Sequence, residues 1–213
     1  EILRCLVGSE MCIRDSAHTD EYGTVIQPNA QPGDIRFKDL NHDGKLDDND
    51  KTFIGNAFPD LMVGINARLV WKNIDFAANF YGTIGNDVYN TTKGRYSGVS
   101  GENVYAGTYN ASWHGEGTSY DLPRLSYNDA NQNWTRVSSF YVEDGSYLRC
   151  KQLQIGCTLP KKWTKKISLR LSFSAQNPFT ITGYSGMDPE AAALGTEGKV
   201  TESGIDWAGY PNC

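Results

Sequence analysis

Apolar and polar side chains alternate with a period of two residues in four segments of the chain. This period is typical of a β-strand that has one apolar face. The alternation predicts strands at about residues 61–71, 74–82, 147–159 and 167–177. The polar pair Lys72 and Asn73 joins the first two strands, and a short basic connection at 160–166 joins the last two. The chain is therefore predicted to be all-β, with antiparallel strands arranged in two hairpins.

The connections between these strands differ greatly in length. The loop between the two hairpins covers about residues 83–139 and shows little periodicity. Such long loops are uncommon in compact domains, whereas a transmembrane β-barrel combines short turns on one side with long extracellular loops on the other. A β-sandwich with its apolar faces turned inward has the same alternation along each strand. Both architectures fit the pattern, and the loop lengths favour the barrel.

The first 16 residues differ in character from the rest of the chain. Residues 1–16 have no helical or alternating period and resemble translated adapter sequence. They are expected to be non-native and are left out of the fold prediction. A short N-terminal helix is the alternative for this tract.

Composition narrows the range of partners. The 213 residues carry 20 Lys and Arg against 25 Asp and Glu, a net charge of −5, so no nucleic-acid partner is expected. No apolar run is long enough for a membrane-spanning helix. Cys150 and Cys157 lie seven residues apart in one predicted strand, which places them on opposite faces and excludes a disulfide between them.

The most specific chemical signal is a calcium-loop pattern at residues 39–50. Oxygen-bearing side chains at alternate positions of a tight turn converge on one point, and Ca²⁺ takes about six to eight oxygen ligands. Gly44 permits the turn, and Lys45 would supply only its main-chain carbonyl oxygen. The predicted metal ligands are Asp39, Asn41, Asp43, Lys45, Asp47 and Asp50. No helices are predicted beside the loop, so the ion would be structural; a solvated turn rich in Asp and Asn is the alternative.

The long loop is rich in aromatic residues interleaved with Gly, Asn, Ser and Thr. Such rings suit sugars or peptides, because a ring face covers C–H surface while polar neighbours fix the orientation of the ligand. The predicted ligand-binding residues are Trp113, Tyr120, Tyr127 and Trp134. The alternative is that these rings pack the loop against itself. The three histidines have no Ser or Cys at motif spacing, so no catalytic residues are predicted and the chain is not expected to be an enzyme.

Four segments carry a family resemblance. They are residues 32–60 (PGDIRFKDLNHDGKLDDNDKTFIGNAFPD), 85–90 (GNDVYN), 138–160 (SSFYVEDGSYLRCKQLQIGCTLP) and 176–190 (QNPFTITGYSGMDPE). Together, and in this order, they resemble the C-terminal barrel region of the SusC/RagA family of TonB-linked outer-membrane receptors. The resemblance implies a large transmembrane β-barrel of about 22 strands around an N-terminal plug, with long extracellular loops.

The resemblance also implies a function and a set of partners. The whole protein would import oligosaccharides or peptides, with a SusD-like surface lipoprotein as its lid. TonB would supply energy through an N-terminal part that precedes these residues, and outer-membrane lipid would surround the barrel. The expected location is the outer membrane of a Bacteroidetes-like Gram-negative cell, and the chain is expected to be a fragment of the importer.

The predicted organisation has three parts: residues 1–16 as the non-native tract, 17–60 as an extracellular loop segment with the calcium pattern, and 61–213 as part of the barrel. In a barrel, the odd-numbered positions of 61–71 and 167–175 and the even-numbered positions of 74–80 are expected to face lipid. Two alternatives stay open. One is a secreted, calcium-stabilised, carbohydrate-binding β-sandwich. The other is a surface glycosidase, for which no carboxylate pair can be located.

Overall fold

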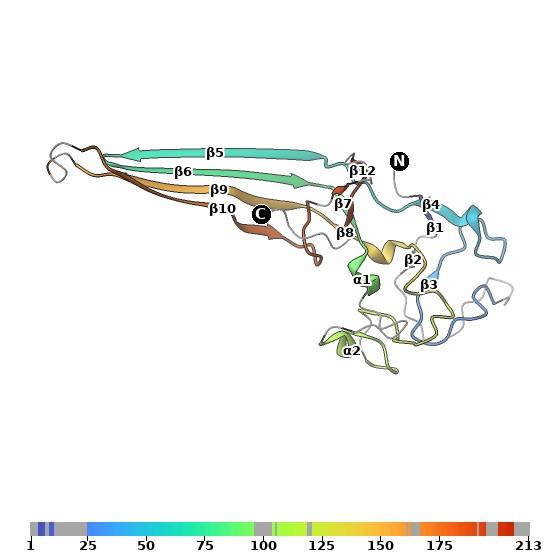
Figure 1. Cartoon of the computed structure of the whole chain (residues 1–213). Coiled ribbons are helices and arrows are strands. Elements are labelled where there is room, and N and C mark those ends of the chain that lie inside the picture. Colours follow the sequence, from blue (N-terminus) through green and yellow to red (C-terminus); the bar gives the residue numbers. More distant parts are fainter. Residues whose placement is uncertain are drawn as a thin grey trace.

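The computed structural model is an elongated sheet that projects from a body built mainly of loops (Figure 1). The structure describes residues 4–6, 9–10, 25–95, 104, 106–118, 121–160, 162, 167–190, 192–194 and 200–206. No helix within these ranges is long and apolar enough to cross a membrane.

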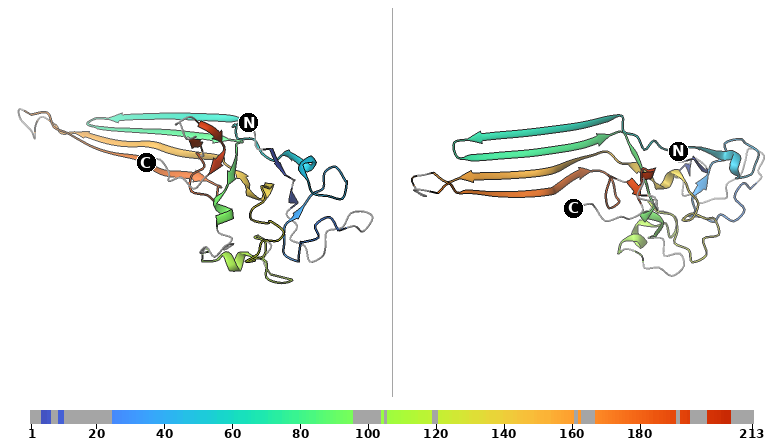
Figure 2. Two further views of the ribbon diagram at one scale, coloured as in Figure 1. Left: turned by 45° about the vertical axis from the view of Figure 1, so that its right-hand side comes forward. Right: turned by 45° about the horizontal axis from the view of Figure 1, so that its top comes forward.

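The long sheet consists of two antiparallel hairpins that lie side by side (Figure 2). Its strands are β5 (Leu61–Trp71), β6 (Ile74–Ile84), β9 (Tyr147–Thr158) and β10 (Arg170–Thr182), in the order β10-β9-β6-β5. The largest difference from the expected bounds is at β10, which starts at Arg170 and continues to Thr182. The Leu159 N–H donates to the Leu169 carbonyl at 2.8 Å, so the residues just before Arg170 close the connection from β9.

The register of the sheet places the apolar positions of all four strands on one face. Directly paired residues of antiparallel strands share a face, as in the row that contains Leu69, Phe76, Ile155 and Phe173. The apolar face comprises Leu61, Val63, Ile65, Ala67, Leu69, Trp71, Ile74, Phe76, Ala78, Phe80, Gly82, Ile84, Leu148, Cys150, Leu153, Ile155, Cys157, Leu171, Phe173, Ala175, Phe179 and Ile181. The alternating positions predicted to lie together therefore do so. Phe173 is 68% exposed and Leu69 is 66% exposed.

The opposite face of the sheet is mainly polar. This polar face comprises Met62, Gly64, Asn66, Arg68, Val70, Asp75, Ala77, Asn79, Tyr81, Thr83, Tyr147, Arg149, Gln152, Gln154, Gly156, Thr158, Arg170, Ser172, Ser174, Gln176, Thr180 and Thr182. One face of the sheet is therefore suited to an apolar environment and the other to water.

A β-bulge at Lys151 shifts the alternation within β9. Two adjacent residues of β6 pair with Gln152 and Cys150, so Lys151 is an extra residue in β9. One extra residue moves all later side chains of a strand to the other face. Cys150 and Cys157 therefore lie on the same face, and the prediction that they face opposite ways is wrong. Both are free thiols.

The body joins the predicted calcium segment to the long loop. Its short elements are β3 (Arg36–Phe37), η1 (Asp48–Asp50), β4 (Lys51–Phe53), β7 (Asp87–Asn90), α1 (Thr92–Arg95), α2 (Thr108–Ala111), η3 (Ser139–Tyr141) and β8 (Val142–Asp144). Its core comprises Ile35, Phe37, Trp134, Phe140 and Tyr141. Residues about 100 positions apart in sequence thus share one core.

Short strands near both ends of the chain complete the sheets. Near the C-terminus, β11 (Ala192–Leu194) and β12 (Val200–Ser203) pair with each other, while β13 (Ile205–Asp206) runs parallel to β7, which also pairs with β8. Within the tract that the fold prediction left out, β1 (Arg4–Leu6) pairs with β4 and β2 (Ser9–Glu10) pairs with β3. The described parts of this tract are strands and not the alternative helix.

Candidate functional site

Residues 39–50 form a compact turn that two buried aspartates hold together. The Asp39 carboxylate accepts a hydrogen bond from the main-chain N–H of Gly44, with 2.8 Å between Oδ2 and N. The Asp50 carboxylate accepts from the main-chain N–H groups of Leu40 and Asp47, each at 2.9 Å. Gly44 has a φ of 78°, a left-handed conformation that glycine adopts without strain. The first and last aspartates of the predicted loop thus close it from inside.

The other predicted ligands lie on the outside of the turn. Asn41 and Asp43 are exposed, and Asn41 Nδ2 donates to Asp43 Oδ2 at 2.9 Å. Asp47 is exposed and caps η1 by accepting from the Asn49 N–H at 2.8 Å, while the Lys45 side chain is also exposed. In the part of the chain that the structure describes, no three His, Cys, Asp or Glu side chains are grouped closely enough to hold a metal ion.

One carboxylate oxygen of the turn is unsatisfied. Asp39 is only 6% exposed, and its Oδ1 atom is buried without a hydrogen-bond partner among the described residues. Burying such an oxygen without a donor is unfavourable, and a hard cation would satisfy it. The chemistry of Asp39 and of the oxygen-bearing side chains that follow it therefore fits Ca²⁺ as a ligand set.

The predicted aromatic residues occupy different environments. Trp134 lies in the core of the body, edge-on to Phe140 with 6.0 Å between ring centroids. Trp113 packs over Gly33, where a Cβ atom would lie 2.1 Å from the indole ring. Tyr127 is 78% exposed, and Tyr120 lies outside the described residues. Ligand binding by these four residues stays a prediction, and Trp134 has a clear packing role.

A buried polar network that the sequence analysis missed joins the two halves of the body. Asp34 Oδ1 accepts from Asn133 Nδ2 at 2.8 Å and from Arg124 Nε at 2.6 Å. The Gln27 side chain donates to Asn131 Oδ1 at 2.9 Å and accepts from the Phe37 N–H at 2.9 Å. The bonds from Asp34 to Asn133 and from Gln27 to Asn131 join residues about 100 positions apart in sequence, so no local motif could have indicated them.

A second missed cluster lies on the polar face of the sheet. Arg149 is buried and forms ion pairs with Asp188 and with Glu190, at 2.8 Å for the latter. Its Nε atom also donates to Thr180 Oγ1 at 2.9 Å. Lys151, the extra residue of the bulge, reaches the same Glu190 carboxylate at 2.8 Å. The acidic segment after β10 is thereby fixed to the polar face.

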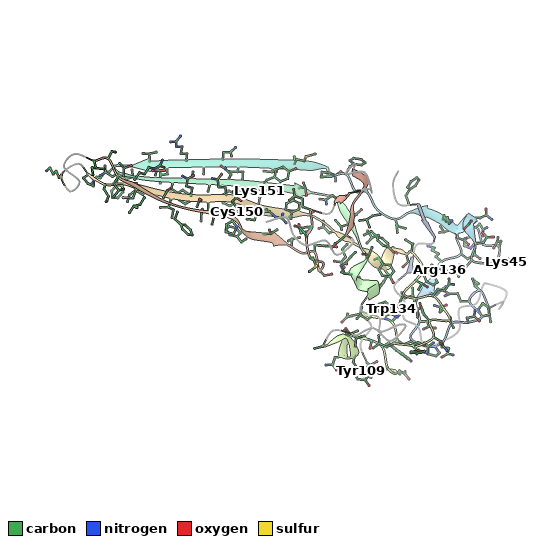
Figure 3. The ribbon with its side chains drawn as sticks, viewed as in Figure 1. Lys45, Tyr109, Trp134, Arg136, Cys150 and Lys151 are labelled. Carbon is green, nitrogen blue, oxygen red and sulfur yellow. The ribbon has the colours of Figure 1, made fainter. Side chains whose placement is uncertain are left out.

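A third missed feature is a cavity of about 430 Å³ in the body. It lies between residues 25–29, the turn residues 44–46 and the segment 130–136. Figure 3 labels Lys45 and Arg136, which contribute the two cationic side chains of its lining. The cavity therefore adjoins the predicted calcium turn.

Glu143 links the body to the segment after β10. Its carboxylate pairs with Lys93 at 2.6 Å and accepts from the Ser185 N–H at 2.9 Å and the Ser185 hydroxyl at 2.8 Å. Burial opposes ionisation of Glu143, but the bonds from Lys93 and Ser185 outweigh burial and hold the pKa of this carboxyl below its ordinary value.

This lowered pKa predicts a dependence of stability on pH. A carboxyl with a lower pKa in the folded state contributes its stability above the unfolded-state pKa and loses it as the pH falls through the folded-state pKa. We expect the melting temperature of the whole protein to fall less between pH 7 and about pH 3 in Glu143→Gln than in the wild type. The exposed Glu116→Gln is the control, and an equal fall in all three proteins would contradict the role of Glu143.

No known family model matches this chain. It is 35% identical over 193 residues to the TonB-dependent receptor P3 of Formosa agariphila, covering 88% of this chain and 19% of the relative. It is 25% identical over 194 residues to the TonB-dependent receptor SusC of Bacteroides thetaiotaomicron, covering 89% of this chain and 18% of the relative. The chain thus spans about a fifth of the length of the curated relatives it matches.

Solved structures show the same fold. The RagAB peptide transporter superposes with a TM-score of 0.62 at 20% identity, over 84% of this chain and 20% of that chain. The RagAB peptide importer in its closed-closed state superposes with a TM-score of 0.64 at 17% identity, over 97% of this chain and 21% of that chain. The sequence relatives and these structures agree with the resemblance carried by the four segments. Over nearly nine tenths of its length, the chain is therefore similar to one region of TonB-dependent receptors of the SusC/RagA type.

Proposed function

We propose that the whole protein imports oligosaccharides or peptides across the outer membrane, and that β5, β6, β9 and β10 form part of its barrel wall. One observation carries the proposal: the apolar face is continuous over four strands and carries many exposed large apolar side chains, mainly on β5 and β10, with the polar face behind it. A barrel wall needs such a division, because one face meets lipid and the other meets the lumen. The full barrel would have about 22 strands.

The soluble β-sandwich is the competing fold, and the exposure of the apolar face argues against it. A sandwich buries its apolar face against a second sheet. Here Leu69, Leu171 and Phe173 are 60% or more exposed, and apolar patches of this extent on soluble proteins are rare. Contact with lipid would remove the apolar side chains of this face from water.

The body would then lie at the extracellular side. The body lies at one end of the sheet, and the tight turn at Lys72 and Asn73 lies at the other end (Figure 1). In outer-membrane barrels the short turns are periplasmic and the long connections are extracellular. There it would form part of the mouth through which the nutrient enters. A SusD-like lipoprotein would cover this mouth, and TonB would act through the N-terminal part of the whole protein. The names of the similar proteins, which are receptors and peptide transporters, support transport and not catalysis.

Uptake by living cells tests the import proposal. A strain that lacks the complete gene is grown on a panel of neutral and acidic oligosaccharides and of mixed peptides as sole carbon sources. We expect growth to be lost on at least one substrate class and restored by the complete gene, but only when TonB is present. Unchanged growth on every substrate of the panel would contradict the proposal.

We further propose that the turn at residues 39–50 holds a structural Ca²⁺ ion. The ligands would be Asp39, Asn41, Asp43, Asp47, Asp50 and the main-chain carbonyl of Lys45. The unsatisfied Oδ1 atom of Asp39 supports this proposal, together with the spacing of the oxygen-bearing residues. Binding would require the outer ligands Asn41 and Asp43 to turn toward Asp39.

Calcium titration of the purified receptor tests this site. We expect millimolar Ca²⁺ to raise its melting temperature, because an ion that binds only the folded state at about ten times its Kd stabilises it by roughly 1.4 kcal/mol. The increase should vanish in Asp39→Asn and persist in Asp48→Asn, whose carboxylate lies outside the predicted ligand set and pairs with Lys51. An equal response of both variants, or no response of the wild type, would rule out this site.

A further inference from the structure

We propose that the cavity between residues 25–29, 44–46 and 130–136 binds a carboxylate group of the imported oligomer. The inference rests on the proposed function and adds the chemistry of the ligand. The lining contains Lys45 and Arg136 but no acidic side chain. The cavity therefore offers an anion a positive site beside an acidic turn.

Arg136 is the central group of this site, because no carboxylate among the described residues pairs with its charge. Arg124, Arg149 and Arg170 each form an ion pair with a carboxylate. Arg136 has no such partner in the described part of the chain, where the one hydrogen bond of its side chain runs from Nη2 to Gln132 Oε1 at 3.3 Å. A guanidinium group has five N–H donors, so most of the donors of Arg136 remain available.

The guanidinium group of Arg136 is also held in place. Its Cζ atom lies 4.8 Å from the centroid of the buried Phe37 ring, a cation–π contact that favours this position of the guanidinium. Burial lowers the pKa of Arg136 from its ordinary value, which reflects the loss of water around an unpaired charge. A bound carboxylate would take the place of the lost water and offset the free-energy cost of burying the unpaired charge.

The back of the cavity is pre-organised by buried amides. Gln27 Nε2 and Asn131 Nδ2 both donate to the Ile35 carbonyl, at 3.1 and 3.0 Å. These side chains are fixed by the network that joins the two halves of the body, so they shape the wall and leave recognition to Arg136 and Lys45. A rigid wall around a fixed charge lowers the entropy that a ligand loses on binding.

A carboxylate matches this arrangement best among groups that occur in oligosaccharides and peptides. It is planar and accepts two parallel bonds from a guanidinium group, and Lys45 can add a further charge at the rim. The volume of about 430 Å³ suits a single sugar ring or the end of a peptide. Both a uronic acid and a peptide C-terminus present the required group.

Binding to the purified whole receptor tests the site without requiring transport. The acidic probes are trigalacturonate and trialanine, the latter through its C-terminal carboxylate; each is compared with a counterpart that lacks the carboxylate, trigalactose and trialanine amide. We expect at least one acidic probe to bind more tightly than its counterpart. Arg136→Gln should weaken that binding by about tenfold to a hundredfold, because hydrogen bonds to charged groups are the strong ones. The probe that binds identifies the source of the carboxylate.

Two further variants keep the test decisive. Ala130→Trp fills the cavity at an exposed position without changing charge, and it should abolish binding even if Arg136→Gln fails to fold. Lys38→Gln removes a nearby charge outside the lining and should leave binding unchanged. The proposal is overturned if neither acidic probe binds better than its counterpart, or if Ala130→Trp and Arg136→Gln bind like the wild type. The uptake experiment tests import separately, so a failure of this binding site would leave the proposed import function standing.

Discussion

Ile65→Arg is expected to prevent stable assembly of the receptor in the outer membrane, whereas Asn66→Arg is expected to be tolerated. Ile65 lies near the middle of β5 on the apolar face and is 49% exposed. The adjacent Asn66 lies on the polar face. A cationic side chain on the lipid face near the bilayer midplane costs roughly 2–4 kcal/mol, while one that faces the lumen costs little.

This pair of variants is measured by the heat-modified mobility of the receptor on gels and by its unfolding in urea after reconstitution in lipid. The wild type and Asn66→Arg should give similar amounts of folded receptor and similar urea midpoints. Ile65→Arg should give less folded receptor and a lower midpoint. Equal tolerance of both variants would contradict the orientation of the sheet, since the two positions differ only in the face on which they lie.

Arg149→Met is expected to destabilise the receptor by about 3 kcal/mol, because it removes one partner of a buried ion pair and leaves the Asp188 carboxylate without its cation. The Arg149 side chain is 6% exposed and that of Asp188 is 14% exposed. The segment that contains Asp188 should then detach from the polar face. Urea unfolding of the whole receptor and proteolysis of this segment would both report the change.

Lys151→Met is the matched control for this prediction. Lys151 reaches the same Glu190 carboxylate, but its side chain is 37% exposed and Glu190 is 42% exposed. Ion pairs in such exposed positions contribute less than about 1 kcal/mol. Equal losses of stability in the two variants would show that burial does not determine how much each ion pair contributes to the free energy of unfolding. A coupling energy near zero between Arg149→Met and Asp188→Leu would show that the pair itself is unimportant.

The four long strands could be predicted from the sequence because each has one apolar face, and a side-chain period of two is a local property. The position of the bulge could not. Lys151 is one additional polar residue within an alternating run, and only its pairing with β6 identifies it as the extra residue. For this reason the sequence predicted that Cys150 and Cys157 lie on opposite faces of the sheet, whereas they lie on the same face. The true end of β10 at Thr182 also depended on pairing with β9 and not on its own sequence.

The body shows the same division between local and long-range information. The turn at residues 39–50 is local, so its spacing could indicate a tight turn there, while calcium binding by its side chains stays a prediction. Asp34 and Asn133, in contrast, are about 100 residues apart in sequence, so no local spacing could predict their hydrogen bond. Trp134 illustrates the remaining ambiguity: an aromatic residue among polar neighbours suits either a ligand or a core, and its contact with Phe140 is a core contact.

The central claim is that the apolar face of the sheet meets lipid and the polar face meets water. Spin labels placed one at a time at positions 62–70 of β5, in an otherwise cysteine-free receptor reconstituted in lipid, test it most directly. Accessibility is measured to oxygen, which concentrates in lipid, and to a nickel chelate, which stays in water. We predict that oxygen access peaks at odd-numbered positions and nickel access at even-numbered positions. Nickel access at every position, or no alternation of either reagent, would contradict the claim.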